Sequence, residues 1–413
     1  MTSRFRSTVV AACAVLFATV ASAQTTIQLG GKSTLTIKGF ISATAFAQDQ
    51  QFTFGNGQNA EWPTPPQFTA DRWFGGADIR NTRLTMVFDG PKVGGDWKVG
   101  GTLELDFFGG FNGTGGFSGQ QPVPRLRLGF ATITNGRTTI HIGQQWSPLF
   151  GNVPVSLSHI AFPLGYGSAG MVGWRFPGIF IYQTLTPKDS PVNAELQLAV
   201  MQNTWNAPCP TSSASCTIDN ASPGNATGPQ YEVRANVGGK AGKGSWSVYI
   251  VGHSDTKDLS NANATAAKDK VSGSAYEAGA RFAFGPVMLQ GNFYSGHSIG
   301  QNFGAISQFQ NGIATGAHRD RIASSGGWVQ LGIDITPNWS IFGFWGEDNP
   351  KDNDIKALGA AARNDNILYA TMLRWRTGPY ALGFEYLHAR LLTGPTNVKT
   401  AGNQLALSTF FSF

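Results

Sequence analysis

Charge is what this sequence has little of. Charged residues make up 13% of its 413 residues, about half the fraction that is usual in soluble domains. Aromatic residues, by contrast, make up 12%. A mean hydropathy of −0.12 excludes a polytopic helical membrane protein, which needs several apolar runs of about 20 residues. The aromatic and β-branched content excludes intrinsic disorder. What remains is a large β-rich protein, much of whose surface does not face water.

Cysteine is also scarce, with three in the chain. Cys13 falls in a leader described below, which leaves Cys209 and Cys216 in a Pro/Ser-rich segment. In an oxidising compartment, two such neighbours most simply form one local disulfide. A metal site would need further Cys or His ligands nearby, and the segment has neither. We therefore expect a Cys209–Cys216 disulfide and no metal.

Catalytic motifs are missing as well. The sequence has no G-x-S-x-G or H-E-x-x-H string, and its six histidines are scattered singly. Residues 165–170 match G-x-G-x-x-G by letters, but a Pro-containing loop precedes them and a strand-like segment follows, so no βαβ unit surrounds them. We expect no enzyme and no cofactor. The net charge of +6 is spread along the chain rather than gathered in a basic stripe, so we expect no nucleic-acid partner.

The N-terminus has the pattern of a secretory signal peptide. Arg4 and Arg6 form a positive region, an apolar stretch runs from residue 9 to residue 20, and Ala-Ser-Ala ends at residue 23. An anchor helix would need a longer apolar run. We expect residues 1–23 to be cleaved after Sec export and residues 24–413 to form the mature domain.

The rest of the chain repeats one pattern, the alternation of apolar and polar residues that is typical of strands. In residues 97–107, Val99, Leu103 and Leu105 share one face, while Glu104 and Asp106 share the other. Soluble sandwiches alternate too, so a single strand does not decide the class. The links between strands decide more. Eight long links alternate with seven short turns; the long ones are 48–75, 109–123, 147–170, 204–228, 253–273, 297–325, 346–365 and 392–402.

Sixteen strands follow from this rhythm, with all the long links at one end and both termini at the other. This pattern predicts an all-β fold, a transmembrane antiparallel up-and-down β-barrel with long extracellular loops and short periplasmic turns. Strands of about 9–11 residues are long enough to span when tilted, and a closed barrel leaves no unpaired backbone in lipid. The location expected is the bacterial outer membrane. The final Phe413 resembles the signature read by the barrel-assembly machinery, which we expect as a partner together with outer-membrane lipid.

Two neighbouring segments resemble a known family. Arg125-Leu-Arg-Leu-Gly-Phe is followed, after a short Asn-Gly turn, by Ile-His-Ile-Gly-Gln-Gln-Trp-Ser-Pro-Leu-Phe ending at residue 150. They resemble the fourth and fifth strands of trimeric sixteen-stranded porins, and the DcaP-like porins in particular, in which a Gly-Gln-x-Trp-Ser segment leads into the third loop. The resemblance implies a homotrimer and a third loop that folds into the barrel and narrows it. The loop would then bring His159 and Tyr166 to the constriction. An ordinary exposed loop is the alternative.

Charged residues opposite the apolar faces are the candidates for the pore lining, because large barrels enclose a polar channel. Arg125, Arg127 and Arg137 lie across one tight turn and are expected to form a basic ladder that faces Glu104 and Asp106. The alternative is that each charged side chain only keeps the pore wall hydrated and has no role in selectivity. The whole set is Arg83, Glu104, Asp106, Arg125, Arg127, Arg137, His141, Arg281, Arg374 and Arg376.

The function expected is passive diffusion of small hydrophilic solutes with a mild preference for anions such as carboxylates, because fixed charges in a pore set its selectivity. A channel specific for a sugar or phosphate is the alternative, and a structural barrel with a plugged lumen is a third class. Trp146, Trp246 and Trp375 are expected to point outward and to form interfacial girdles rather than a slide for sugars.

Overall fold

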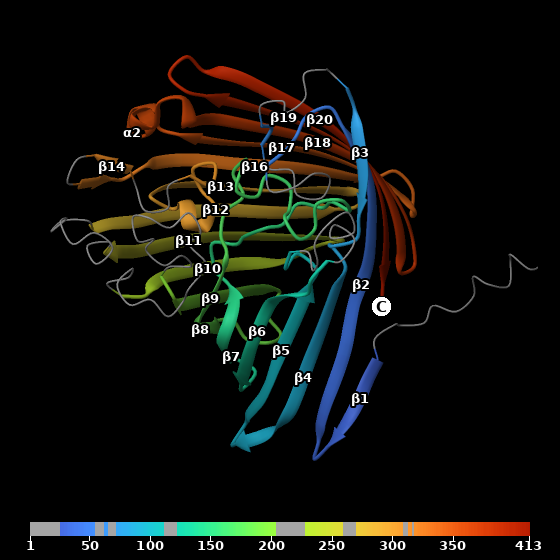
Figure 1. The fold of residues 1–413 in the computed structure, drawn as a ribbon. Helices are drawn as coiled ribbons and strands as arrows, with labels where there is room; N and C mark the ends of the chain where they lie inside the picture. The colour runs from blue at the N-terminus through green and yellow to red at the C-terminus, as the bar shows by residue number, and fades with distance from the viewer. Residues whose placement is uncertain are drawn as a thin grey trace, which may run out of the picture.

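The strands wrap into a single barrel (Figure 1). The computed structural model describes residues 25–53, 62–64, 72–110, 122–203, 228–258, 270–308, 313–315 and 318–413. The expected signal peptide (1–23) and the expected disulfide partners Cys209 and Cys216 lie outside these residues. In the described ranges, no helix is long and apolar enough to cross a membrane.

The first half of the chain contributes β1 (Thr25–Gly30), β2 (Ser33–Gln48), β3 (Phe74–Asp78), β4 (Arg83–Gly94), β5 (Trp97–Asp106), β6 (Arg125–Thr134), β7 (Thr138–Trp146), β8 (Arg175–Thr184) and β9 (Val192–Met201). The second half contributes β10 (Gln230–Ala241), β11 (Gly244–Asp258), β12 (Lys270–Phe284), β13 (Val287–His297), β14 (Ile313–Thr315), β15 (His318–Asp320), β16 (Ala323–Asp334), β17 (Trp339–Pro350), β18 (Arg363–Thr377), β19 (Tyr380–Thr393) and β20 (Val398–Ser412). Short helical segments are η4 (Gly300–Asn302), α2 (Asp352–Ile355) and η5 (Lys356–Ala361).

The barrel closes where the last strand, β20, pairs antiparallel with β2. β3 and β4 occupy one strand position, because β3 pairs with residues 44–48 of β2 and β4 pairs with residues 34–40. Apart from β1 and the separate β14–β15 hairpin, the described strands therefore fill sixteen antiparallel positions. The predicted sixteen-stranded antiparallel barrel is confirmed.

The break between β3 and β4 keeps its backbone hydrogen bonds through one side chain. The Thr82 hydroxyl donates to the Ser42 carbonyl at 3.2 Å and accepts from the Ser42 N–H at 3.1 Å. A buried backbone group without a partner would be costly, so the hydroxyl substitutes for the missing strand residue. The freed segment carries Asn81, which turns into the barrel.

The two faces of the wall differ as the alternation predicts. On β12, Tyr276 is 55% exposed and Phe284 is 46% exposed, whereas Glu277, on the opposite face of the strand, is buried. Aliphatic and aromatic side chains are likewise exposed along the outer face of the other strands, as at Ile142, Ile250 and Leu373. An outward apolar face opposite a polar interior is the pattern of a wall that lies in lipid.

β1 covers an edge that the barrel closure leaves open. Phe413, the last residue, exchanges two backbone hydrogen bonds with Gly39, so β20 ends at the middle of β2. β1 then pairs with residues 33–37 of β2, the part of the strand that β20 does not reach. Figure 1 shows β1 beside the lower part of β2, beyond the marked C-terminus.

Several extracellular links are shorter than expected. β11 continues to Asp258 and β12 begins at Lys270, so the 253–273 link shrinks to residues 259–269. The 346–365 link shrinks to residues 351–362, and the 392–402 link is a four-residue turn, 394–397. These strands are longer than expected because ladder pairing continues through the polar residues that follow the apolar alternation.

Candidate functional site

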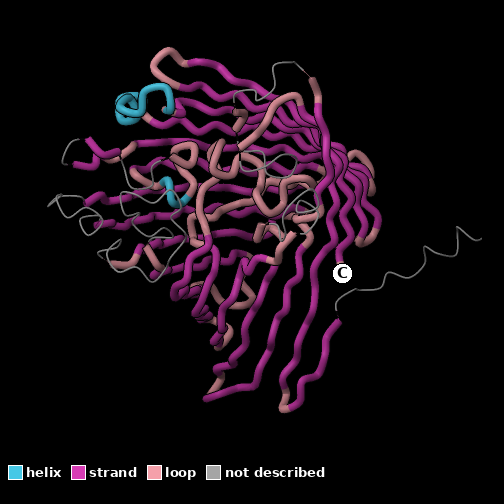
Figure 2. The backbone as a smooth tube through the Cα atoms, viewed as in Figure 1, coloured by secondary structure: helices cyan, strands magenta, loops and turns pink. Residues whose placement is uncertain are grey.

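The link between β7 and β8, residues 147–174, lies inside the barrel, and we call it the inner loop. Figure 2 shows loop segments filling the space enclosed by the strands. One end of the loop is held by β10, where Glu232 accepts the Leu149 N–H at 2.8 Å. Its far side is held by β19, where Glu385 accepts the backbone N–H groups of Leu157 and Ser158 at 2.6 and 2.8 Å.

Further wall groups hold the loop between these two points. Gln330 on β16 accepts the Val155 N–H at 2.7 Å and donates to the Val155 carbonyl at 2.8 Å. Asn81, in the break between β3 and β4, donates to the Ser158 carbonyl and accepts the Ala161 N–H. The inner loop therefore crosses the barrel and contacts much of its wall, as the family resemblance implied.

A second segment, residues 298–308, packs onto the inner loop from the link after β13. Phe303 stacks against Tyr166 and lies beside Trp174, with ring centres 4.7 and 4.8 Å apart. The Ser307 hydroxyl donates to the Gly167 carbonyl at 2.7 Å. These rings join an apolar cluster with inward residues of β16 to β19, including Trp328 and Leu368. One side of the lumen is thus filled by packed side chains.

This packing changes the expected role of the two constriction residues. His159 is 3% exposed and Tyr166 is 1% exposed. His159 hydrogen-bonds Ser158 within the loop, and its burial lowers its pKa to about 4. Tyr166 donates to the Gly173 carbonyl. Both side chains stabilise the loop from inside rather than facing the open lumen.

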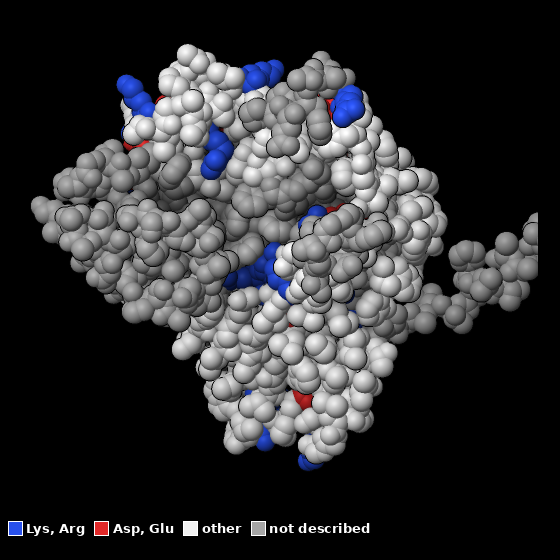
Figure 3. Space-filling view, viewed as in Figure 1, with Lys and Arg blue, Asp and Glu red and all other residues white. Residues whose placement is uncertain are grey.

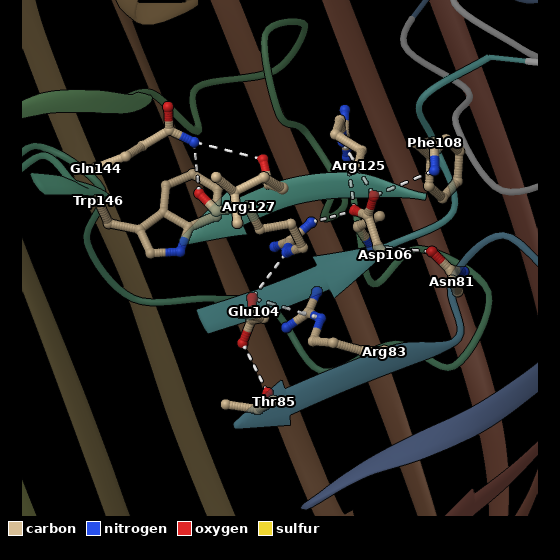
Figure 4. Close-up of polar contacts among 12 residues, drawn as sticks. Asn81, Arg83, Thr85, Glu104, Asp106, Phe108, Arg125, Arg127, Gln144 and Trp146 are labelled. Atoms are coloured by element: carbon tan, nitrogen blue, oxygen red, sulfur yellow. Dashed lines mark hydrogen bonds and ion pairs between the residues drawn. The ribbon is translucent and has the colours of Figure 1, made fainter. Parts of the chain in front are cut away.

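The charged residues expected on β4, β5 and β6 do come together, and we call Arg83, Glu104, Asp106, Arg125 and Arg127 the arginine cluster (Figure 4). Arg125 binds Asp106 with two nitrogens, at 3.0 and 2.7 Å. Arg127 bridges the two acids, with Nε 2.8 Å from Glu104 and Nη1 2.7 Å from Asp106. Paired, charge-assisted hydrogen bonds of this kind are the strong ones.

A β-bulge allows both arginines to face the acids. Along β5 and β6 the register shifts, so that Glu104 is opposite Leu128 but Leu105 is opposite Leu126. Arg127 is the extra residue, and a bulge re-aims the side chain that it carries. Arg127 is consequently buried beside Asp106, while Arg125 keeps 22% of its side-chain surface exposed.

Arg83 is bound less tightly than its neighbours. Its Nε lies 3.7 Å from Glu104, beyond hydrogen-bond reach, and its Nε and Nη2 have no hydrogen-bond partner. Glu104 instead accepts from Arg127 and from the Thr85 hydroxyl. The partial exposure of Arg83 and Arg125, 18% and 22%, lets water in the lumen reach them. Figure 3 shows Lys and Arg atoms gathered in the hollow at the centre of the face in view.

The other predicted pore-lining residues lie apart from this cluster. Arg137 is exposed in the turn after β6, some 30 Å of strand away from Arg125 by the rise of about 3.3 Å per residue, so the expected three-membered ladder is wrong. His141 stacks on Phe130 at 4.2 Å between ring centres. Arg281 binds Gln290, Arg374 donates to Ser340, and Arg376 is exposed near the turn after β18.

Arg175 and Trp146 were not recognised from the sequence as parts of this site. Trp146 was expected to point outward, but its ring lies 5.5 Å from the Arg127 guanidinium and stacks on Phe150 at 3.7 Å. The alternation on β7 breaks at Gly143, whose φ is +138°. Arg175, opposite Trp146 on β8, lies over the rings of Trp146 and Trp174 at 4.9 and 4.5 Å. The one sign of these residues in the sequence was the adjacent pair Trp174-Arg175 at the end of the inner loop.

Among the described residues, no group of three or more His, Cys, Asp or Glu side chains is arranged to hold a metal ion. The chemistry available at the site is therefore that of guanidinium groups, carboxylates and aromatic faces. Such groups bind and orient small solutes through charge, hydrogen bonds and stacking.

The fold is similar to those of solved outer-membrane channels. The outer-membrane channel DcaP of Acinetobacter baumannii matches with a TM-score of 0.67 and 18% identity, over 94% of this chain and 99% of that one. An anion-selective porin from Comamonas acidovorans matches with a TM-score of 0.55 and 12% identity, over 92% and 100%. OprB of Pseudomonas putida matches with a TM-score of 0.53 and 11% identity, over 91% and 94%.

No family model matches the sequence, and no curated protein matches it either. The predicted likeness to the DcaP-like porins is confirmed at the level of the fold, a closed sixteen-stranded barrel of the outer-membrane porin type.

Proposed function

We propose that this protein is an outer-membrane porin through which small hydrophilic solutes diffuse passively, with a mild preference for anions such as carboxylates. The observation that supports the preference most directly is the charge of the inner wall beside the inner loop. Arg83, Arg125 and Arg127 pair with two carboxylates, Glu104 and Asp106, and Arg175 lies beside them over Trp146, which leaves an excess of two positive charges. An excess positive field in a narrow pore favours anions.

The closest alternative is a channel specific for a sugar or phosphate. The aromatic rings beside the arginines support it, because Arg125 lies over Phe108 and Phe162, and Arg127 lies over Trp146. Aromatic faces bind cations such as guanidinium groups, and they also stack against the apolar faces of sugar rings. Inhibition of the current by an oligosaccharide at concentrations where a simple carboxylate has no effect would favour this alternative.

We further propose a homotrimer, with β2 and β3 against the neighbouring barrels. The outward face there carries small side chains, Ala43, Ala45 and Ala47 on β2 and Ala77 on β3. Small outward residues let two walls approach closely. Assembly into the membrane through recognition of the terminal Phe413, after export and removal of residues 1–23, belongs to the same proposal.

The test is the reversal potential of the purified protein in planar bilayers under a KCl gradient. A potential that indicates chloride permeation, with conductance steps in groups of three, is the expected result. A potassium-leaning potential would refute the anion preference. A folded barrel without conductance steps would refute the porin and favour the plugged class.

A further inference from the structure

Arg175 is a buried cation without a carboxylate of its own. The residue is 5% exposed, and neither its Nε nor its Nη1 has a hydrogen-bond partner. In the part of the chain that the structure describes, no carboxylate oxygen lies within ion-pair distance of it. A buried charge without a partner is expensive, so a polar partner is to be expected at this position.

The aromatic neighbours satisfy only part of the guanidinium. Trp146 and Trp174 lie against its faces, with ring centres 4.9 and 4.5 Å from Cζ. Cation–π contacts of this kind stabilise the charge through the faces of the group. The N–H donors point outward in the plane of the guanidinium, where Nε and Nη1 are buried and have no acceptor among the described residues.

The nearby carboxylates are already engaged. Asp106 accepts from Arg125 twice, from Arg127 and from the Phe108 N–H. Glu104 accepts from Arg127 and Thr85. Both Arg127 and Arg175 lie over the Trp146 ring, so Arg175 adds its charge to a cluster whose acids cannot neutralise it.

We propose that Arg175, between Trp146 and Trp174, is a binding site for a small singly charged anion that is accepted in the guanidinium plane. The ligand class comprises halide and nitrate ions and the terminal carboxylate of an organic solute. The site deepens the proposed anion preference, on which it rests for access from the lumen. It makes Arg175, rather than the paired Arg125 and Arg127, the arginine whose buried N–H groups a bound anion would satisfy.

The two indoles provide the readout, because iodide quenches tryptophan fluorescence on contact. Titrating the folded, detergent-purified protein with sodium iodide at constant ionic strength should show a saturable component of quenching on top of the linear collisional one. Arg175→Gln should remove that component, or raise its half-saturation concentration by roughly tenfold or more, the usual size of a lost hydrogen bond to a charged group. Arg175→Lys, which keeps the charge but loses the planar donors, should weaken it less.

Arg321→Gln is the matched control, since it makes the same charge change at an exposed arginine ahead of β16 and should leave the saturable component intact. Competition separates the two sources of the ligand: acetate should displace iodide if carboxylates bind, whereas displacement by chloride alone restricts the site to inorganic ions. Either result supports the site.

A saturable component that persists in Arg175→Gln, or none in the native protein, would overturn the inference. The reversal potential under a KCl gradient tests the proposed function separately. If it remains chloride-leaning while the iodide component is missing, the site at Arg175 is refuted and the anion-preferring porin stands. If it is potassium-leaning, the proposed function is refuted whatever iodide does.

Discussion

Two arcs of the inner wall carry inward carboxylates that have different partners. From β10 to β19, Glu232, Asp348 and Glu385 accept backbone N–H groups of the inner loop and of the 298–308 segment. On β5, Glu104 and Asp106 accept from arginines instead. These three acids of the first arc position chain inside the barrel, whereas Asp255 on β11 pairs with Lys257. The second uses its acids to hold guanidinium groups at the edge of the open lumen.

The difference shows how one residue type serves two purposes. An amide N–H is neutral, so a carboxylate that binds it remains an anchor hidden under the loop. A guanidinium is charged, so in each pair on β5 its positive charge cancels the negative charge of the carboxylate. The net charge of the arc is then the number of arginines minus the number of carboxylates. Four arginines and two carboxylates therefore give the arginine arc its positive sign.

The largest expected effect comes from breaking the loop-holding arc at Glu385. Glu385→Ala removes the acceptor for the Leu157 and Ser158 N–H groups and for the Ser156 hydroxyl. Each buried donor left without its acceptor costs about 1–3 kcal/mol, and three such donors are enough to detach this part of the inner loop. We expect single-channel conductance to rise roughly twofold, with added noise, as the constriction widens.

Glu385→Gln is the control for this change, because it keeps one acceptor oxygen and should give a smaller rise. Limited proteolysis provides a second measurement, since a detached loop becomes a substrate. Native conductance together with native protease resistance in Glu385→Ala would show that Glu385 does not hold the loop.

The second effect comes from removing an acid from the arginine arc. Asp106→Asn leaves Arg125 and Arg127 with one carboxylate fewer and raises the local charge by one. We expect the chloride-to-potassium permeability ratio to rise about two- to fivefold at low salt and the increase to shrink as salt screens the charge. Reversal potentials at two ionic strengths measure both. Asp189→Asn, in an exposed periplasmic turn, makes the same charge change and should leave the ratio unaltered.

A smaller effect of opposite sign is expected from Arg83→Gln. Arg83 has no hydrogen-bond partner for its Nε or Nη2, so its removal deletes positive charge without breaking a strong pair. The permeability ratio should fall by roughly a factor of two, below the change at Asp106 because the residue is partly exposed to water. Arg374→Gln, on the loop-holding arc, should change it less. Equal shifts in the two variants would mean that the arcs do not differ in their influence on permeating ions.

The barrel could be predicted from sequence because its determinants are local. Alternation places Tyr276 outside and Glu277 inside, and turn residues separate the strands. The arginine partners of Glu104 and Asp106 were expected, but those of Glu232 and Glu385 could not be predicted, because they depend on where residues 147–174 fold after leaving β7. The inward position of Trp146 could not be predicted for a related reason. A positive φ at Gly143 shifts the alternation on β7, and the amino-acid sequence gives no sign of it.

The smallest expected effect tests the corrected position of Arg137. The residue is exposed in the turn after β6, where its Nη2 donates to the Leu185 carbonyl, and it is separated from the arginine cluster by the length of that strand. Over such a distance, well beyond the Debye length of about 10 Å at 0.1 M salt, its charge is screened from solutes at the constriction. Arg137→Gln should therefore leave the reversal potential within experimental error of the native value, although it deletes the same charge as Arg83→Gln. A shift as large as that of Arg83→Gln would place the selectivity of the pore at its periplasmic mouth, and the contrast between the two arcs would then lose its functional meaning.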